Sequence, residues 1–293
     1  MHDRWDALVM DLDGTLLCGA GQVSPANLAA LDAVRNAGVE VVVATGRCYR
    51  ECTHILKEIG HEGVVIAAGG SLLCDDGGQT LCRHILKESL VREIAGHVLQ
   101  GGHRLLLLKD AAECGADYVL VGDAPLHAAS SWWFDAFDVR VIEARTIDDD
   151  PWPKCTIRAG AVADEEHLAT AAAVIKETVG RRARLQHWSA VTSSEATGSA
   201  THLLEVFESS VNKWSMLERH LGASLNPGRI VAIGDGLNDI ELLQEAGLSI
   251  AMANADDHVI AHANVIGGHH NEHGFAAAVG EWVLSADRGD AAS

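Results

Sequence analysis

Short apolar runs alternate with stretches of helical length near the start of the chain, and this alternation constrains the fold more than any other feature. The runs ALVM (7–10), VEVVVA (39–44) and GVVIAA (63–68) each have the length and composition of a fully buried strand. Residues 24–38 and 48–60, which separate them, have the apolar spacing of helices. This strand–helix–strand order predicts a parallel sheet with right-handed crossovers.

Local signals and the C-terminal part of the chain support the same fold. Ser24 is placed as an N-cap with Pro25 in the first turn, and Gly38 follows the last turn of that helix. Strand-like runs return at RIVAIG (229–234) and LSIAMA (248–253), again with helical stretches between and after them. We therefore expect the two ends of the chain to form one Rossmann-like, doubly wound α/β domain.

The middle of the chain has many strand candidates and few helices, with hairpin-like spacing. This pattern predicts an antiparallel sheet covered by helices, and hence an inserted α+β domain. We expect a discontinuous core domain at 1–82 and 189–293 and an inserted domain at 83–188. The strand candidates are residues 104–108, 116–121, 139–144, 154–161, 183–188 and 201–207, and the helix candidates are 85–100, 125–136 and 164–179.

Composition narrows the partners and the compartment. The 293 residues carry a formal net charge of −19, which disfavours nucleic acid and anionic membrane surfaces as partners. The sequence contains no apolar stretch long enough to span a bilayer and no signal-peptide pattern at its start. Its seven cysteines are odd in number and scattered, which favours a reducing cytoplasm. Nothing in the composition sets the oligomeric state, and a homo-oligomer is compatible with it.

Polar and glycine residues follow four of the predicted strands. In an open parallel sheet the carboxyl ends of the strands lie at one edge, where ligands bind. The residues expected at that edge are Asp11, Asp13, Gly14 and Thr15, then Thr45, Gly46 and Arg47, then Gly69, Gly70 and Ser71, and finally Gly234, Asp235, Gly236, Asn238 and Asp239.

The acidic residues of this set predict a metal site. Asp11 and Asp13 lie two residues apart on an extended segment, so their side chains point the same way and repel each other. Asp235 and Asp239 come from another strand end and from one helical turn beyond it. Carboxylates gathered in this way suit a hard cation, and Mg²⁺ fits better than zinc, which prefers His and Cys ligands.

The neutral and basic residues of the set predict an anion site beside the metal. Thr45 and Arg47 can donate hydrogen bonds to phosphate oxygens. Gly46 and the other loop glycines allow backbone N–H groups to approach an anion closely. A phosphorylated substrate is therefore the ligand that these residue types favour.

Four short motifs occur in the order that is typical of a known family. DLDGT (11–15), ATGR (44–47), Lys213 at the start of a helix, and GDGLND (234–239) resemble the four motifs of the haloacid-dehalogenase-like hydrolases. The insertion between the second and third motifs resembles the larger α/β cap of the Cof-type branch, and so does the late segment GGHHNEHGFAAAV. The resemblance implies a core domain that carries the chemistry and a cap that selects the leaving group.

The resemblance also implies roles for the acidic residues. Asp11 would be the nucleophile that forms an aspartyl-phosphate, and Asp13 would be the general acid and then the general base. Mg²⁺ would be bound by Asp11, by the backbone carbonyl of Asp13, by Asp235, and by Asp239 directly or through water. The substrate-binding residues would be Thr45, Gly46, Arg47, Lys213, Asn238 and Asn271.

The implied reaction is Mg²⁺-dependent hydrolysis of a small phosphomonoester, such as a sugar phosphate or a similar metabolite. A phosphotransferase or phosphomutase on the same scaffold is the alternative, and a non-catalytic sensor of a phosphorylated metabolite is a third reading. Two departures from the family pattern stand out. The chain has Ala68-Gly69-Gly70 where the family often has Asn-Gly, and Trp214 follows the motif lysine instead of a small residue.

Overall fold

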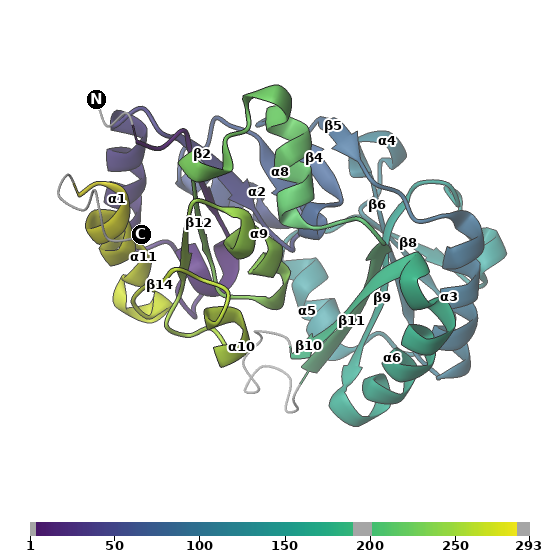
Figure 1. Cartoon of the computed structure of the whole chain (residues 1–293). Helices are drawn as coiled ribbons and strands as arrows, with labels where there is room; N and C mark the ends of the chain where they lie inside the picture. The colour runs from purple at the N-terminus through teal and green to yellow at the C-terminus, as the bar shows by residue number, and fades with distance from the viewer. Residues whose placement is uncertain (1–3, 190–200, 286–293) are drawn as a thin grey trace. The chain divides into compact units, whose positions relative to one another are not determined.

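The computed structural model of the chain describes residues 4–189 and 201–285, and it contains two compact units (Figure 1). The first unit comprises the described parts of Met1–Arg47, Cys52–Gly77 and Asn212–Ser293. The second comprises the described parts of Cys48–Glu51 and Gly78–Val211. The first unit is therefore built from both ends of the chain, and most of the second is a single insertion.

The first unit is built on a mostly parallel sheet, which confirms the predicted α/β fold. Its strands have the spatial order β14-β13-β12-β1-β2-β3-β4. Every neighbouring pair from β14 to β3 is parallel, whereas β3 and β4 pair in the antiparallel direction. The strands are β1 (Ala7–Met10), β2 (Glu40–Ala44), β3 (Val65–Ala67), β4 (Leu72–Cys74), β12 (Ile230–Gly234), β13 (Leu248–Ala251) and β14 (Val265–Ile266).

The strand order reverses between β1 and β12, and this point of the sheet determines where a ligand can bind. From β1 the chain continues outward to β2 and β3, whereas from β12 it continues in the opposite direction to β13 and β14. In open α/β sheets, ligands bind outside the carboxyl ends of the strands at such a reversal of strand order, so the loops that leave β1 and β12 are where we look for a site. The register pairs Met10 with Ile233, so Asp11 and Asp235 leave the sheet at nearly the same level.

Helices cover both faces of this sheet. Ser24 caps α1 by accepting a hydrogen bond from the backbone N–H of Asn27, and Pro25 is the first residue of the helix, as predicted. α1 packs against α11 and β2, while α8 packs against α9 and β3, so the two pairs lie on opposite faces (Figure 1). The helices are α1 (Pro25–Asn36), α2 (Tyr49–Glu58), α8 (Lys213–Leu221), α9 (Ile240–Glu245), α10 (Asp257–Ile260) and α11 (Gly274–Ala278).

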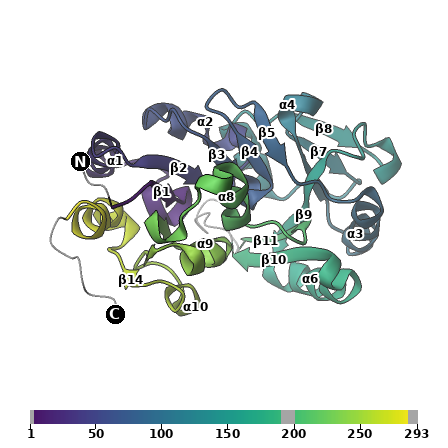
Figure 2. The same ribbon diagram turned by 45° about the horizontal axis from the view of Figure 1, so that its top comes forward.

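The second unit is built on a six-stranded sheet with the order β10-β11-β9-β6-β7-β8. Its helices α3 (Glu88–Gln100) and α6 (Glu165–Val179) pack side by side (Figure 2). The strands of this sheet are β6 (Leu105–Lys109), β7 (Tyr118–Val121), β8 (Val141–Ala144), β9 (Thr156–Asp164), β10 (Ala183–Ser189) and β11 (Thr201–Glu208). The unit also contains β5 (Thr80–Arg83), α4 (Ala111–Cys114) and α5 (Ala128–Ala136).

Two details of the second unit differ from the sequence prediction. The sheet is not purely antiparallel, because β7 and β8 pair in parallel, with α5 connecting them as a crossover helix. The end of the inserted domain also differs: β11, which matches the strand candidate 201–207 of the middle of the chain, pairs with both β9 and β10. The boundary expected after residue 188 would therefore divide a hydrogen-bonded strand pair, and we place it after Val211 instead.

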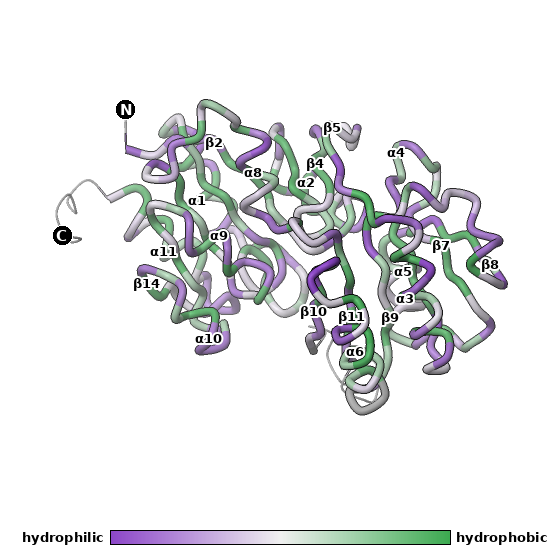
Figure 3. The backbone as a smooth tube through the Cα atoms, turned by 45° about the vertical axis from the view of Figure 1, so that its right-hand side comes forward, coloured by the Kyte–Doolittle hydropathy of each residue, from purple (hydrophilic) through white to green (hydrophobic). Residues whose placement is uncertain are grey.

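The strands of the second unit are mostly apolar, as the green colour of β7 illustrates (Figure 3). Lys109, at the end of β6, is an exception because its side chain is fully buried. Its Nζ lies 2.6 Å from Oδ2 of Asp150 and also donates to the backbone oxygen of Trp152 and to Oγ1 of Thr156. Among the helices of the described residues, none is long and apolar enough to cross a membrane.

Replacing the buried ammonium of Lys109 tests its contribution to the second unit. We expect Lys109→Met to lower the free energy of unfolding by about 3 kcal/mol or more, because it leaves the buried carboxylate of Asp150 without its cation. The same substitution at the exposed Lys154 is the control, with an expected change of less than about 0.5 kcal/mol. Urea denaturation measures both. Equal losses in the two variants would contradict the structural role of the pair.

Candidate active site

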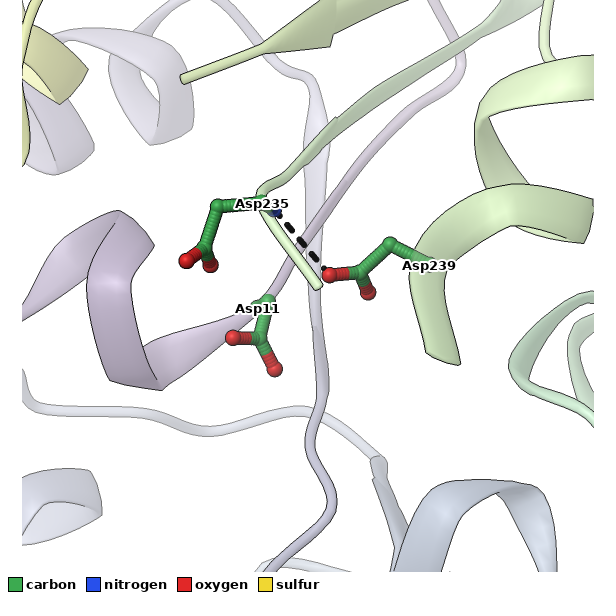
Figure 4. Close-up of side chains that lie close together, drawn as sticks. All are labelled: Asp11, Asp235 and Asp239. Carbon is green, nitrogen blue, oxygen red and sulfur yellow. Dashed lines mark hydrogen bonds between the residues drawn. The ribbon is translucent and has the colours of Figure 1, made fainter. Parts of the chain in front are cut away.

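Three carboxylates from two distant parts of the sequence lie close together at the carboxyl ends of β1 and β12 (Figure 4). Asp11 directly follows β1, and its backbone N–H still donates to the oxygen of Ile233 on β12 at 3.0 Å. Asp235 directly follows β12, and Asp239 lies four residues further on. One oxygen of each carboxylate lies within 4.8 Å of the others.

A glycine allows the loop after β1 to approach Asp235. Gly14 has a φ of +74°, and a Cβ added to it would lie 2.1 Å from Oδ2 of Asp235. The next residue, Thr15, donates from its hydroxyl to Oδ1 of Asp235 at 2.9 Å. The loop after β1 thus touches Asp235 with both its backbone and a side chain, which requires a residue without a Cβ at position 14.

The side chain of Asp239 folds back on its own loop. Its Oδ2 accepts hydrogen bonds from the backbone N–H groups of Asp235 and Gly236, at 3.1 and 2.9 Å. The dashed line in Figure 4 marks the first of these bonds. Its Oδ1 is the oxygen that faces Lys213.

Lys213 joins the cluster through a fully buried side chain. Its Nζ lies 2.7 Å from Oδ1 of Asp11 and 2.6 Å from Oδ1 of Asp239. Lys213 is the first residue of α8, whose N-terminus is capped by the side chain of Asn212. Gly70 makes this placement possible, because a Cβ on Gly70 would lie 2.2 Å from the backbone oxygen of Asn212. Gly70, in the segment that departs from the family pattern, therefore lies against the backbone at the start of α8.

Burial and mutual repulsion shift the ionisation of this cluster. Burial is the main cause that raises the pKa of Asp11 well above its ordinary value, and Lys213 opposes the shift. Burial and the charge of Asp239 raise the pKa of Asp235 to about 7. Burial by itself lowers the pKa of Lys213, but the attraction of Asp11 and Asp239 more than reverses this. Burial thus disfavours the ionised forms of Asp11 and Asp235, and the charge of Lys213 opposes this at both carboxylates.

This donor set fits a divalent cation. Three carboxylates share one neighbouring ammonium, that of Lys213, which contacts Asp11 and Asp239. Burial and the charge of Asp239 both raise the pKa of Asp235, and a bound cation would favour its ionised form. Mg²⁺ accepts oxygen ligands at about 2.1 Å and combines one or more carboxylates with water and phosphate oxygens. Asp11, Asp235 and Asp239 are therefore the residues that could hold such an ion.

Asp13 is not one of the three clustered carboxylates and pairs with Arg47 instead. The guanidinium of Arg47 donates from Nε to Oδ2 of Asp13 at 2.7 Å and from a terminal nitrogen to Oδ1 at 2.6 Å. Arg47 is 7% exposed, and its backbone N–H donates to Oγ1 of Thr45 at 3.2 Å, with Gly46 between them. Asp11 and Asp13, which lie two residues apart in the sequence, thus have different cationic partners, Lys213 and Arg47.

The two predicted asparagines lie in different places. Asn238 is buried in the short turn Leu237–Asp239, beside the clustered carboxylates in the chain. Asn271 lies in the turn His270–Glu272, where its side-chain oxygen accepts a hydrogen bond from the backbone N–H of Gly19 at 2.7 Å. Asn271 therefore ties the loop after β1 to the C-terminal part of the unit.

Two residues of this site were not assigned from the sequence, Thr15 and Asn254. Thr15 was placed at the ligand edge without a role, and its hydroxyl bonds Asp235. Asn254 follows β13, and its side-chain amide contacts both Gly14 and Asp235. The signal that could have found Asn254 is the one that found the others, since it too follows the carboxyl end of a strand in the parallel sheet.

The sequence matches one family model over most of its length, residues 8–279, and this model describes a haloacid dehalogenase-like hydrolase. The chain is also similar in structure to a haloacid dehalogenase-like hydrolase from Bacteroides thetaiotaomicron, with a TM-score of 0.75 and 20% sequence identity. That similarity covers 94% of this chain and 98% of the other. At this level of sequence identity, the similarity shows that the two proteins share a fold.

Two of the curated relatives that are similar in sequence illustrate the range of matches. A 5-amino-6-(5-phospho-D-ribitylamino)uracil phosphatase of Bacillus subtilis is 26% identical over 281 residues, which cover 94% of this chain and 95% of the relative. A longer protein of Arabidopsis thaliana, named as a chloroplastic endoribonuclease, is 29% identical over 297 residues. The match covers 94% of this chain but only 46% of that protein, so this chain spans about half its length.

The contact between Gly14 and Asp235 can be tested with two matched glycines. Gly14 and Gly21 both have a positive φ, +74° and +72°, but a Cβ on Gly21 would meet no atom within 4 Å. We expect Gly21→Ala to cost about 1 kcal/mol of stability through backbone strain alone. Gly14→Ala should cost about 1–3 kcal/mol more, because the new methyl group must displace Asp235. Thermal unfolding compares the two variants, and equal losses would show that the close approach does not matter.

Proposed function

The chain belongs to the haloacid dehalogenase-like hydrolases, and from this premise we propose that it is a Mg²⁺-dependent phosphatase. Its substrate would be a small phosphomonoester, hydrolysed through an aspartyl-phosphate on Asp11. The observation that carries the proposal is the convergence of Asp11, Asp235 and Asp239, two of which contact Lys213, with a fourth acid, Asp13, paired separately in the loop after β1.

Asp11 is the proposed nucleophile because it is the acid of the cluster that Lys213 holds at the end of the central strand β1. Its carboxylate would attack the phosphorus atom, forming an acyl-phosphate bond while the bond to the leaving oxygen breaks. The ammonium of Lys213 favours the ionised, nucleophilic form of Asp11 and can also bind the oxygens of the transferring group. Bound Mg²⁺ would supply charge neutralisation of the phosphate, held by Asp11, Asp235 and Asp239 and by the backbone carbonyl of Asp13.

Asp13 is the proposed general acid and base. In the first step its proton would pass to the leaving alkoxide, and in the second its carboxylate would take a proton from the water that attacks the aspartyl-phosphate. The second step releases inorganic phosphate and restores Asp11. The bidentate contact with Arg47 orients the carboxylate of Asp13 as it is needed for the second step, and one of the two bonds must open when Asp13 carries the proton of the first step. We therefore propose Arg47 as a positioning residue for Asp13, in place of the substrate-binding role expected from the sequence.

The remaining candidate residues would hold the phosphate group. Thr45 and the backbone of Gly46 lie in the loop after β2, next to the loop after β1 in the sheet order. Asn238 lies in the turn that carries Asp239, and Asn271 anchors the loop after β1. We assign Thr45, Gly46 and Lys213 to direct phosphate contacts. Asn238 is a further candidate for such a contact, whereas the bond of Asn271 to Gly19 favours a role in shaping the loop.

A small phosphorylated metabolite is the proposed substrate class. The Bacillus subtilis relative is named for a phosphorylated ribityl compound, and it matches this chain along nearly all of both sequences. The net charge of −19 disfavours nucleic acid as a substrate. All seven cysteines are free thiols, which fits a cytoplasmic enzyme.

Release of inorganic phosphate from a panel of phosphorylated metabolites tests the proposal. We expect activity that requires Mg²⁺, is lost in EDTA, and falls at least about 10³-fold in Asp11→Asn, since the amide cannot attack phosphorus. Circular dichroism and thermal unfolding should show that Asp11→Asn remains folded. Unchanged phosphate release in that variant would overturn the assignment of the nucleophile.

The products in the same assay separate the alternatives. A phosphomutase or phosphotransferase would yield an isomerised or newly phosphorylated sugar without free phosphate. A sensor would bind a panel member without turnover. Either result with the wild-type protein would contradict hydrolysis as the function.

Arg47→Lys separates positioning of Asp13 from phosphate binding. The substitution keeps the charge but loses the bidentate contact, so we expect kcat to fall about 10–100-fold with little change in KM. A rise in KM at constant kcat would instead assign Arg47 to substrate binding. Arg35→Lys is the control, because Arg35 pairs with the exposed Asp32 and should leave both constants unchanged. Steady-state kinetics on the best substrate of the panel measures the effect.

A further inference from the structure

The side-chain amide of Asn254 links three separate segments of the first unit at the acidic cluster. Its Nδ2 donates to the backbone oxygen of Gly14 at 2.8 Å and to Oδ2 of Asp235 at 3.1 Å. Its Oδ1 accepts a hydrogen bond from the backbone N–H of His270 at 3.1 Å. One amide thus joins the loop after β1, the loop after β12 and the C-terminal turn.

The orientation of this amide follows from its partners. The two atoms beside Nδ2 are a carbonyl oxygen and a carboxylate oxygen, both acceptors, and the atom beside Oδ1 belongs to an N–H donor. The reverse orientation would place an oxygen against two oxygens and an NH₂ group against an N–H. Asn254 is therefore a donor toward Asp235.

The backbone of Asn254 is itself held in place. Met252, two residues earlier, donates its N–H to the oxygen of Gly234 at 3.0 Å, and Ala253 donates to the oxygen of Gly268 at 3.2 Å. These bonds attach the loop after β13 to the end of β12 on one side and to the C-terminal segment on the other. The amide therefore reaches Asp235 from a fixed support.

Both oxygens of Asp235 are bonded by neutral donors. Thr15 donates to Oδ1 at 2.9 Å, and Asn254 donates to Oδ2 at 3.1 Å. Two such bonds determine the plane of the carboxylate and leave each oxygen a further lone pair for a cation. They also place a donor against a carboxylate that would otherwise face mainly the repulsion of Asp11 and Asp239.

We propose that Asn254 is a positioning residue, which orients Asp235 for Mg²⁺ and holds Gly14 against it. The identity of the ion, Mg²⁺, rests on the proposed function, whereas the contacts of Asn254 do not. Asn254 contacts two parts of the active site without itself belonging to the carboxylate cluster.

Two substitutions of Asn254 distinguish positioning from simple charge effects. Asn254→Ala removes both donated bonds, and we expect the dissociation constant for Mg²⁺ to rise about 10–100-fold. Asn254→Asp adds a negative charge but replaces the donor by an acceptor 3.1 Å from Asp235. If negative charge alone decided affinity, Asn254→Asp would bind Mg²⁺ more tightly; positioning predicts that it too binds more weakly.

Asn264→Ala is the matched control. Asn264 is an asparagine of the same unit whose side-chain oxygen accepts two hydrogen bonds from Ser249, at 2.8 and 3.0 Å. Loss of this side chain in Asn264→Ala should lower the melting temperature without changing the dissociation constant for Mg²⁺. A general loosening of the unit would instead weaken Mg²⁺ binding in both alanine variants.

Isothermal titration of the full chain with Mg²⁺, in the absence of substrate, is the primary measurement. The kinetic counterpart is the Mg²⁺ dependence of kcat, in which excess Mg²⁺ should restore turnover to Asn254→Ala. Folded Asn254 variants that bind Mg²⁺ as tightly as the wild type would overturn the inference. Wild-type protein that binds no Mg²⁺ would overturn the proposed metal dependence instead, so the two failures are distinct.

Discussion

A buried ammonium group allows acids from opposite ends of the sequence to share one enclosed site. Removing carboxylates from water is costly unless a cation lies beside them, and Lys213 supplies that cation to Asp11 and Asp239. The parallel pairing of β1 with β12 brings the acids together, and the start of α8 delivers the lysine. One ammonium does not balance three carboxylates, and this deficit is the physical reason for expecting a divalent ion.

The site also separates two acids that lie two residues apart. Asp11 joins the buried cluster at the sheet, whereas Asp13 turns to a bidentate contact with Arg47. The different partners give the two carboxylates different surroundings, as the proposed roles require, since a nucleophile attacks phosphorus and a proton donor protonates the leaving oxygen. Neutral residues complete the arrangement, since Gly14 permits the close approach to Asp235 and Asn254 holds it there.

Elements whose signals are local could be predicted from the sequence. The buried strands β1 and β2 and the cap of α1 depend on residues within a few positions of one another, and the structure confirms them. The end of the inserted domain could not be read in this way: residues 201–207 are a strand candidate of the middle of the chain, yet the boundary expected after residue 188 excludes them. Long-range pairing with β9 and β10 decided it.

By itself the sequence determined which residue types follow each strand, and therefore that acids, a threonine and an arginine would stand at one edge of a parallel sheet. Strand order and register were needed to show that Asp11, Asp235 and Asp239 come within 4.8 Å of one another. Only the tertiary structure decided how the polar groups pair: that Arg47 bonds Asp13 and that Asn254 supports Asp235. The physical reason is that a hydrogen bond depends on distances of a few tenths of an ångström between residues far apart in the chain, which no local pattern encodes.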